Sequence, residues 1–402
     1  MSRTKTDVIG LIKNIYAKGL IRVKYKHLLS RSSAAVFMLL FFVGACLLSA
    51  CGQEPIGTGD GGPLPAKIAE PLTQVRLVDA NSGWALTKHA ILHTLNGGQQ
   101  WSDVTPPSAM ASGGDKAEST FQTAQRAWVV VPASISGSSG GLHIVVWHTT
   151  DAGKNWTSVT INDSDAVGLA DRPNFVDDKH GWLLVNLSAG AGSQGVHLYH
   201  TNDAGQTWKI IAQAPGSLSL SGQKAGPTFE NTQQGWISHS VGALTDSVLV
   251  ERSNDGGVTW ADNNLPPLAG VTDAFYETTP PVFIGWTGLM PVHVSSSAGQ
   301  WLAMYSSGND GGRWYASYTK DFDTHDIYIA DETHYWALDK GALYANTTGA
   351  SNWSKIATLA STADKMSFIN ANQGWITDTA NAVLYHTTDG GHTWTTIHYT
   401  IV

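Results

Sequence analysis

Short runs of apolar residues alternate with short polar turns along most of the chain. Residues 175–185, FVDDKHGWLLV, consist of an apolar segment, a polar turn and a second apolar segment. Residues 195–211, GVHLYHTNDAGQTWKII, repeat this arrangement around an Asp-containing turn with Gly two positions later. Apolar runs of this length between turn residues are typical of short β-strands joined by hairpins. Together the two segments predict a unit of four strands.

The turn in the second segment belongs to a motif that recurs along the chain. Its form is Ser or Thr, any residue, Asp or Asn, any residue, Gly, any two residues and Trp. It occurs at 94–101, 149–156, 201–208, 253–260, 307–314 and 387–394, and a degenerate copy occupies 346–353. The acid or amide positions are Asn96, Asp151, Asp203, Asp255, Asn309 and Asp389, and the closing tryptophans are Trp101, Trp156, Trp208, Trp260, Trp314, Trp353 and Trp394. In such a turn the carboxylate accepts backbone N–H bonds and Gly adopts positive φ, so we assign these residues structural roles.

A second tryptophan, usually preceded by Gly, comes before each copy of the turn. These residues are Trp84, Trp128, Trp182, Trp236, Trp286, Trp336 and Trp375. Seven positions earlier stands a large apolar residue in six units, whereas the fifth unit has Thr279 there. Fourteen of the 16 tryptophans occupy the two repeated positions, so we expect them to form the core. The other two, Trp147 and Trp301, are expected to pack against a neighbouring unit or, alternatively, to stack on a sugar or a partner.

Seven such units predict an all-β fold, a single seven-bladed β-propeller. The expected blades span 71–115, 116–168, 169–222, 223–270, 271–322, 323–360 and 361–402. Two ways of closing the ring remain open. Either the C-terminal TTIHYTIV pairs within its own blade, or the stretch before Leu77 adds a strand to the last blade and covers its edge.

The N-terminus has the layout of a secretory signal peptide, which we assign to residues 1–50. A basic segment is followed by the apolar run AAVFMLLFFVGACLLSA at 34–50. The alternative is a retained membrane helix, for which 17 residues is the lower limit. The sequence LSAC at 48–51 resembles the lipobox of bacterial lipoproteins, which implies lipidation of Cys51. Residues 51–70 are rich in Gly and Pro and are expected to form a tether. The protein is therefore expected on the outer side of the cytoplasmic membrane.

Charge and cysteine usage narrow the function. The 402-residue chain has 24 basic and 32 acidic residues, and residues 1–50 carry eight of the basic ones and one acid. The remaining body has a formal net charge of 16 − 31, or −15, which argues against binding to nucleic acid. Cys46 and Cys51 are the only cysteines. We therefore expect no disulfide framework, no cysteine metal site and no cofactor.

The turn motif is the Asp box, which is found in sialidases, other glycoside hydrolases and sortilin-type receptors. Its repetition after a Gly-Trp strand, as in QGWIT at 373–377, most resembles the photosystem II stability and assembly factor family. The resemblance covers residues 72–402. It implies a seven-bladed propeller that is delivered across a membrane and binds a protein complex without catalysing a reaction.

Sialidase chemistry needs a cluster of arginines for the substrate carboxylate. The body has five arginines, of which Arg76 and Arg172 are the two expected near a central channel. We therefore expect no glycosidase activity. His93, His148, His200 and His386 share one repeat position, but equivalent positions lie apart around a ring. These histidines are interpreted as tolerant surface positions, and no metal site is expected.

Residues three positions before the inner apolar anchor are expected at one mouth of the channel. Among them Glu118, Arg172, Asp326 and Lys365 are the candidate binding residues, and a solvated channel lining is the alternative. The face that they share also carries the connections of most variable length. The predicted function is a lipid-anchored, non-catalytic scaffold that binds another protein or a membrane complex. The alternative is a glycan-binding or glycoside-hydrolysing propeller of the sialidase kind.

Overall fold

The computed structural model describes residues 70–402, except 112, 135–141, 242–246, 310, 323, 325 and 349–351. The proposed signal peptide, the lipobox with Cys51 and the tether as far as residue 69 lie outside the described residues. Within the described part, no helix has the length and apolar character needed to cross a bilayer. The one helical element described there is a single 3₁₀ turn, η1 (Gly114–Lys116).

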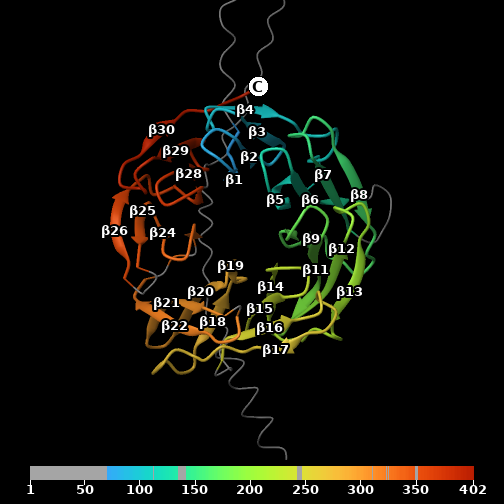
Figure 1. The fold of residues 1–402 in the computed structure, drawn as a ribbon, viewed down its shortest axis with the longest axis vertical. Coiled ribbons are helices and arrows are strands. Elements are labelled where there is room, and N and C mark those ends of the chain that lie inside the picture. The colour runs from blue at the N-terminus through green and yellow to red at the C-terminus, as the bar shows by residue number, and fades with distance from the viewer. Residues whose placement is uncertain are drawn as a thin grey trace, which may run out of the picture. The chain divides into compact units, whose positions relative to one another are not determined.

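Seven antiparallel sheets follow one another along the chain and form a ring, which confirms the predicted seven-bladed propeller (Figure 1). Blade 1 contains β1 (Gln74–Leu77), β2 (Gly83–Leu86), β3 (Ile91–Thr94) and β4 (Gln100–Asp103). Blade 2 contains β5 (Glu118–Phe121), β6 (Ala127–Ser134), β7 (Leu142–Thr149) and β8 (Thr157–Ile161). Blade 3 contains β9 (Leu169–Ala170), β10 (Asn174–Phe175), β11 (Gly181–Gly190), β12 (Ser193–Thr201) and β13 (Lys209–Ala214).

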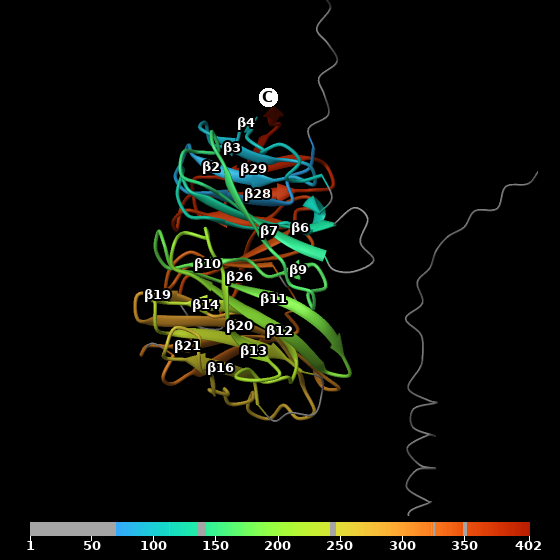
Figure 2. The ribbon, with the colours of Figure 1, turned by 90° about the vertical axis from the view of Figure 1, so that its right-hand side faces the viewer.

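The remaining four blades repeat this arrangement, with the first strand of each at the centre of the ring. Blade 4 contains β14 (Gln223–Phe229), β15 (Gly235–Ser240), β16 (Leu249–Ser253) and β17 (Ala261–Asp262). Blade 5 contains β18 (Phe275–Thr278), β19 (Val282–Ile284), β20 (Thr287–Ser296), β21 (Gly299–Ser307) and β22 (Tyr315–Lys320). Blade 6 contains β23 (Asp326–Ile329), β24 (Tyr335–Asp339), β25 (Ala342–Asn346) and β26 (Ser354–Thr358). Blade 7 contains β27 (Lys365–Phe368), β28 (Gly374–Asp378), β29 (Val383–Thr387) and β30 (Thr395–Ile397). Figure 2 shows the ring from the side, with β11 and β12 facing the viewer.

The tryptophan on the second strand of a blade joins that blade to the next one. Trp182 is fully buried and stacks on Phe229 of blade 4, with ring centroids 3.8 Å apart. Its Nε1 donates a hydrogen bond of 2.8 Å to the carbonyl of Gly256, in the Asp-box turn of blade 4. Trp336 repeats both contacts with blade 7. The buried indoles of Trp182 and Trp336 therefore hold their blade interfaces through packing and through a satisfied N–H donor.

The glycine before this tryptophan is required by close packing. In blade 4 a Cβ on Gly235 would lie 2.4 Å from the ring of Phe229 on the adjacent inner strand. Gly181 and Gly374 stand against the rings of Phe175 and Phe368 in the same way. The repeated Gly-Trp pair thus reflects a backbone that the inner apolar residue covers directly.

The Asp-box turns have the predicted hydrogen bonds. In blade 3 the backbone N–H of Thr207 donates to Asp203 Oδ1 over 2.8 Å, and that of Gly205 donates to Thr201 Oγ1 over 2.9 Å. Ala204 and Gly205 both have positive φ. In blade 7, hydrogen bonds from the side chain and backbone of Thr393 lower the pKa of Asp389 to about 2. These contacts explain the repeated acid through local structure.

Blade 5 departs from the sequence prediction. Phe283 of β19 occupies the inner position, tilted against Trp236 of blade 4 with centroids 4.1 Å apart. Gly288 pairs with Phe283, and the next residue, Leu289, is buried where the other blades place tryptophan. Trp286 instead lies in the β19–β20 turn with 74% of its surface exposed. The prediction that Trp286 belongs to the core is wrong, because the glycine that pairs with the inner residue Phe283 is Gly288 and not Gly285, which leaves Trp286 in the turn.

The C-terminal segment pairs within its own blade, as the first of the two expectations has it, and it also reaches blade 1. The first residues of the C-terminal segment form β30 in blade 7, but β31 (Thr400–Ile401) pairs in parallel with β4, the outer strand of blade 1. Tyr399, which is 5% exposed, donates its hydroxyl hydrogen to the carbonyl of Glu70 over 2.9 Å. The C-terminal segment thus covers the free edge of β4.

Candidate active site

The inner strands surround the centre of the ring (Figure 1). Side chains from these strands line a polar cavity there. It consists of two adjoining hollows of about 800 Å³ and about 940 Å³. Their shared lining residues are Thr120, Arg172, Asn174, Pro280 and Val282. We call these hollows together the central cavity. Because all inner strands run in the same direction, the residues at which they begin meet at one mouth.

The four predicted binding residues all line the central cavity. Glu118, Asp326 and Lys365 are the first residues of β5, β23 and β27, and Arg172 stands two residues before β10. Lys365 Nζ lies 3.3 Å from Asp326 Oδ1 and forms an ion pair between blades 6 and 7. The structure thus brings together the residues that their shared repeat position selected. Whether they bind a ligand stays a prediction.

Asp171, immediately before Arg172, also lines the cavity, and sequence reasoning missed it. Its side chain is partly buried. The Nδ2 of Asn186 donates to Asp171 Oδ1 over 3.2 Å, and the backbone N–H of Gly226 donates to Oδ2 over 3.3 Å. Glu118 lines the same hollow, and its Oε2 accepts a hydrogen bond of 3.2 Å from Gln74 Nε2. Asp171 and Glu118 therefore line one hollow near the mouth, at which Asp326 also stands.

Burial perturbs both carboxyl groups in the same direction. Burial, and to a smaller extent the negative charge of Glu118, raises the pKa of Asp171 to about 7, although Asn186 and Gly226 act against the increase. Burial also raises the pKa of Glu118 above its ordinary value, against the opposing charge of Arg172. A carboxylic acid that titrates near neutral pH can donate a proton to a substrate, and a neighbouring carboxylate can accept one.

A second group of polar side chains lines the cavity at blades 1 and 6. Arg76 Nη1 donates to the hydroxyl of Tyr328, which in turn donates to the carbonyl of Phe368 over 2.7 Å. The guanidinium carbon of Arg76 lies 6.0 Å from the centroid of the Tyr328 ring. The two arginines expected near the channel, Arg76 and Arg172, are both found there.

The turn that carries the exposed Trp286 borders the central cavity through Gly285. This turn is on the face of the Asp-box turns, since strands alternate in direction within each blade. Gly285, the preceding residue, lines the same hollow as Glu118 and Asp171. A ligand in this hollow can therefore extend from the carboxyl groups toward the turn that carries Trp286.

The shared histidine position supports the blade core rather than a metal site. His93 pairs across strands with Trp84, with ring centroids 4.6 Å apart, and is 6% exposed. His148 stacks on Trp128 in the same way, and burial lowers its pKa to about 4. The interpretation of these histidines as surface positions is wrong, because each one packs on its blade's tryptophan. Among the described residues, no group of three or more acidic, His or Cys side chains is arranged to hold a metal ion.

The two tryptophans outside the repeat pack within the blades. Trp301 is 6% exposed in the core shared by blades 4 and 5. Trp147 is partly buried and packs against the core between blades 1 and 2. Both placements agree with the expected packing role.

No family model and no curated protein matches this sequence. Several solved structures are similar. A GH74 xyloglucanase from Xanthomonas campestris is 13% identical with a TM-score of 0.34, and the match covers 82% of this chain and 64% of that one. An ulvan lyase of polysaccharide lyase family PL25 is 9% identical with a TM-score of 0.42, over 83% and 94% of the two chains. The BP39L lectin from Burkholderia pseudomallei is 12% identical with a TM-score of 0.48, over 83% and 97%.

At these identities the similarity shows the propeller fold alone. The chain spans about 64% of the length of the xyloglucanase. The prediction that the protein is not an enzyme is contradicted by these findings, because a glycoside hydrolase and a polysaccharide lyase stand among the similar structures. We therefore withdraw that prediction. The resemblance to the photosystem II assembly factor family rests on the two repeated motifs.

Proposed function

We propose that the protein is a glycan-active propeller that hydrolyses a polysaccharide in its central cavity. The observation that carries the proposal is the pair of carboxyl groups, Asp171 and Glu118, in one hollow that also contains Arg172. Glycoside hydrolysis uses two carboxyl groups, one of which is kept protonated by its surroundings. Asp171, whose pKa is about 7, fits the protonated role.

The reaction assigns one step to each group. Asp171 donates its proton to the oxygen of the leaving sugar as the bond from that oxygen to the anomeric carbon breaks. Water adds to the anomeric carbon, and Glu118 accepts the proton that the water loses. The proton then returns from Glu118 to Asp171 through solvent, so that the net change is the addition of one water molecule. Proton transfer of this kind contributes about 10²- to 10⁴-fold in rate.

The arginines of the cavity can bind a substrate that carries carboxylates, although acids line the cavity as well. Arg76 and Arg172 both line it, and a guanidinium binds a carboxylate in a bidentate manner. Trp286 offers an exposed ring face in the turn that borders the cavity, where a sugar ring can stack. An acidic polysaccharide is therefore the substrate class that we propose.

Release of reducing ends from a panel of neutral and uronic-acid polysaccharides tests this function. The full chain is compared with Asp171→Asn and Glu118→Gln, and Asp262→Asn on the exposed outer strand β17 is the matched control. We expect hydrolysis by the wild type and by Asp262→Asn, with a loss of about 10²-fold or more in the two cavity variants. Equal rates in all four proteins, or no cleavage by the wild type, refute the proposal. Products with an unsaturated sugar end would instead identify a lyase.

We further propose that the propeller is secreted and held on the outer side of the cytoplasmic membrane by a lipid on Cys51. The support is the basic and apolar leader that ends in LSAC. Incorporation of labelled fatty acid into the wild type, and its loss in Cys51→Ser, is the expected result. Labelling of Cys51→Ser to the same extent would refute the anchor.

A further inference from the structure

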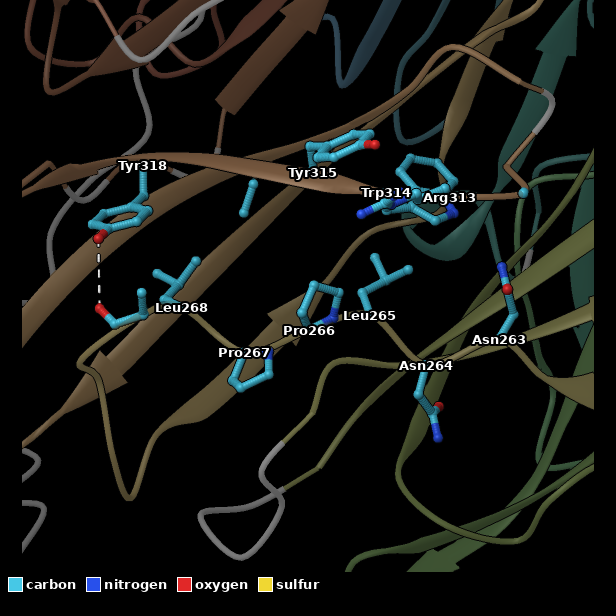
Figure 3. Close-up of a pocket in the computed structure, with 13 residues that line it drawn as sticks. Asn263, Asn264, Leu265, Pro266, Pro267, Leu268, Arg313, Trp314, Tyr315 and Tyr318 are labelled. Atoms are coloured by element: carbon cyan, nitrogen blue, oxygen red, sulfur yellow. Dashed lines mark hydrogen bonds between the residues drawn. The ribbon is translucent and has the colours of Figure 1, made fainter.

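A groove of about 500 Å³ lies on the outer rim, between blades 4 and 5. We call it the rim groove. One wall is the segment 263–269 that follows β17, and the other is 312–316 together with Tyr318. Figure 3 shows Tyr315 and Tyr318, from β22, above Pro266 and Pro267. The rim groove is separate from the central cavity, since the two share no lining residue.

Comparison with the equivalent residue in the other blades shows whether the fold needs an aromatic side chain at Tyr315. Tyr315 is the residue directly after the Asp-box tryptophan and is 57% exposed, and Tyr318 is 40% exposed. In the other six blades the position of Tyr315 carries a small or polar residue: Ser102, Thr157, Lys209, Ala261, Ser354 and Thr395. Because six blades fold without an aromatic residue there, the fold does not require Tyr315. Exposed aromatic rings that the fold does not need point to a ligand.

Two hydrogen-bond donors of the rim groove, on Trp314 and Tyr318, already have partners within the protein. Trp314 Nε1 donates to the carbonyl of Gly311 over 3.0 Å, and the Tyr318 hydroxyl donates to the carbonyl of Ala269 over 3.5 Å. A sugar ring needs an aromatic face for its C–H groups, and the exposed Tyr315 supplies one.

The charge of the rim groove indicates which kind of sugar it can bind. Arg313 is the one charged side chain among the described residues that line the rim groove. Its guanidinium carbon lies over the Tyr315 ring, 5.0 Å from the ring centroid, so the guanidinium and the ring form one surface. A guanidinium recognises a carboxylate through two parallel hydrogen bonds. We propose that the rim groove is a second binding site for an acidic polysaccharide, in which Tyr315 stacks on a uronic acid ring and Arg313 binds its carboxylate.

Affinity electrophoresis of the full chain tests the proposal without requiring cleavage. Gels contain polygalacturonate, neutral xylan or no polysaccharide. The variant Tyr315→Ser places the residue of blade 1 or blade 6 in blade 5, and Lys209→Ser at the same repeat position in blade 3 is the matched control. We expect polygalacturonate to retard the wild type and Lys209→Ser equally. In Tyr315→Ser and Arg313→Gln the dissociation constant should rise at least tenfold.

The outcomes separate this site from the proposed hydrolytic one. Equal retardation of wild type and Tyr315→Ser, a preference for xylan, or displacement of polygalacturonate by an oligoproline peptide would each overturn the rim groove as an acidic-glycan site. A protein that binds polygalacturonate through Tyr315 but releases reducing ends from no polysaccharide of the panel would overturn the hydrolysis proposal and leave the rim groove standing. Circular dichroism and thermal unfolding of Tyr315→Ser that match those of the wild type exclude misfolding as the cause of lost binding.

Discussion

Replacement of Asp171 by Asn separates the catalytic role of this residue from its effect on stability. In the folded protein burial raises the pKa of Asp171 to about 7, from an ordinary value of 3.8. Above pH 3.8 the unfolded chain loses the proton while the folded protein keeps it. The stability of the wild type therefore falls as pH rises from about 4 to about 7. The asparagine side chain of the variant cannot ionise and can still accept a hydrogen bond from Asn186 or Gly226.

The size of the effect follows from the two pKa values. A difference of 7 − 3.8 pKa units, at 1.36 kcal/mol each, is about 4 kcal/mol. We expect the variant to gain little below pH 4 and up to about 4 kcal/mol above pH 7, relative to the wild type. Urea unfolding of both proteins at pH 4, 6 and 8 measures this difference. A constant difference across the three pH values would refute the account of a partly buried Asp171 that stays protonated up to about pH 7.

Three further predictions concern the fold and the cavity. Trp286→Ala should change the free energy of unfolding by less than about 0.5 kcal/mol and weaken substrate binding about tenfold, whereas Trp236→Ala should lower the free energy of unfolding by about 3–5 kcal/mol. Denaturant unfolding measures the stabilities, and KM measures substrate binding. A large loss of stability in Trp286→Ala would contradict the exposure of this residue. Gly235→Ala should lower the free energy of unfolding by about 1–3 kcal/mol, because the new Cβ would overlap a phenylalanine ring. Gly190→Ala should leave the stability unchanged, because open space surrounds Gly190. Similar unfolding midpoints for the two variants would be inconsistent with this packing. Deletion of residues 399–402 should lower the free energy of unfolding by about 2–4 kcal/mol, because it uncovers the edge of β4. An unchanged unfolding curve would show that the C-terminal strand does not stabilise the ring.

Repetition made most of the fold predictable from the sequence. Seven copies of one pattern identify the blade and assign Trp182 and Asp203 their structural roles without any knowledge of long-range contacts. The same logic placed Glu118, Arg172, Asp326 and Lys365 at one mouth, because equivalent positions of inner strands must meet there.

Positions at which a blade departs from the repeat were harder to predict from the sequence. Trp286 was assigned to the core because the repeat was counted from tryptophan, whereas the inner residue Phe283 sets the register of blade 5. The role of Asp171 could not be predicted from the sequence, because its surroundings depend on Asn186 and Gly226, which are 15 and 55 residues away. The parallel pairing of β31 with β4 likewise depends on two ends of the chain that meet only in the closed ring.

The pH dependence of kcat/KM for a polysaccharide substrate tests the central claim most directly, because it reports the pKa values of essential groups in the free enzyme. We predict a bell-shaped profile that falls above about pH 7, the pKa of Asp171, and a greatly reduced rate in Asp171→Asn without that high-pH fall. A high-pH limb that persists unchanged in Asp171→Asn, or wild-type activity that keeps rising above pH 8, would contradict the assignment of Asp171 as the proton donor.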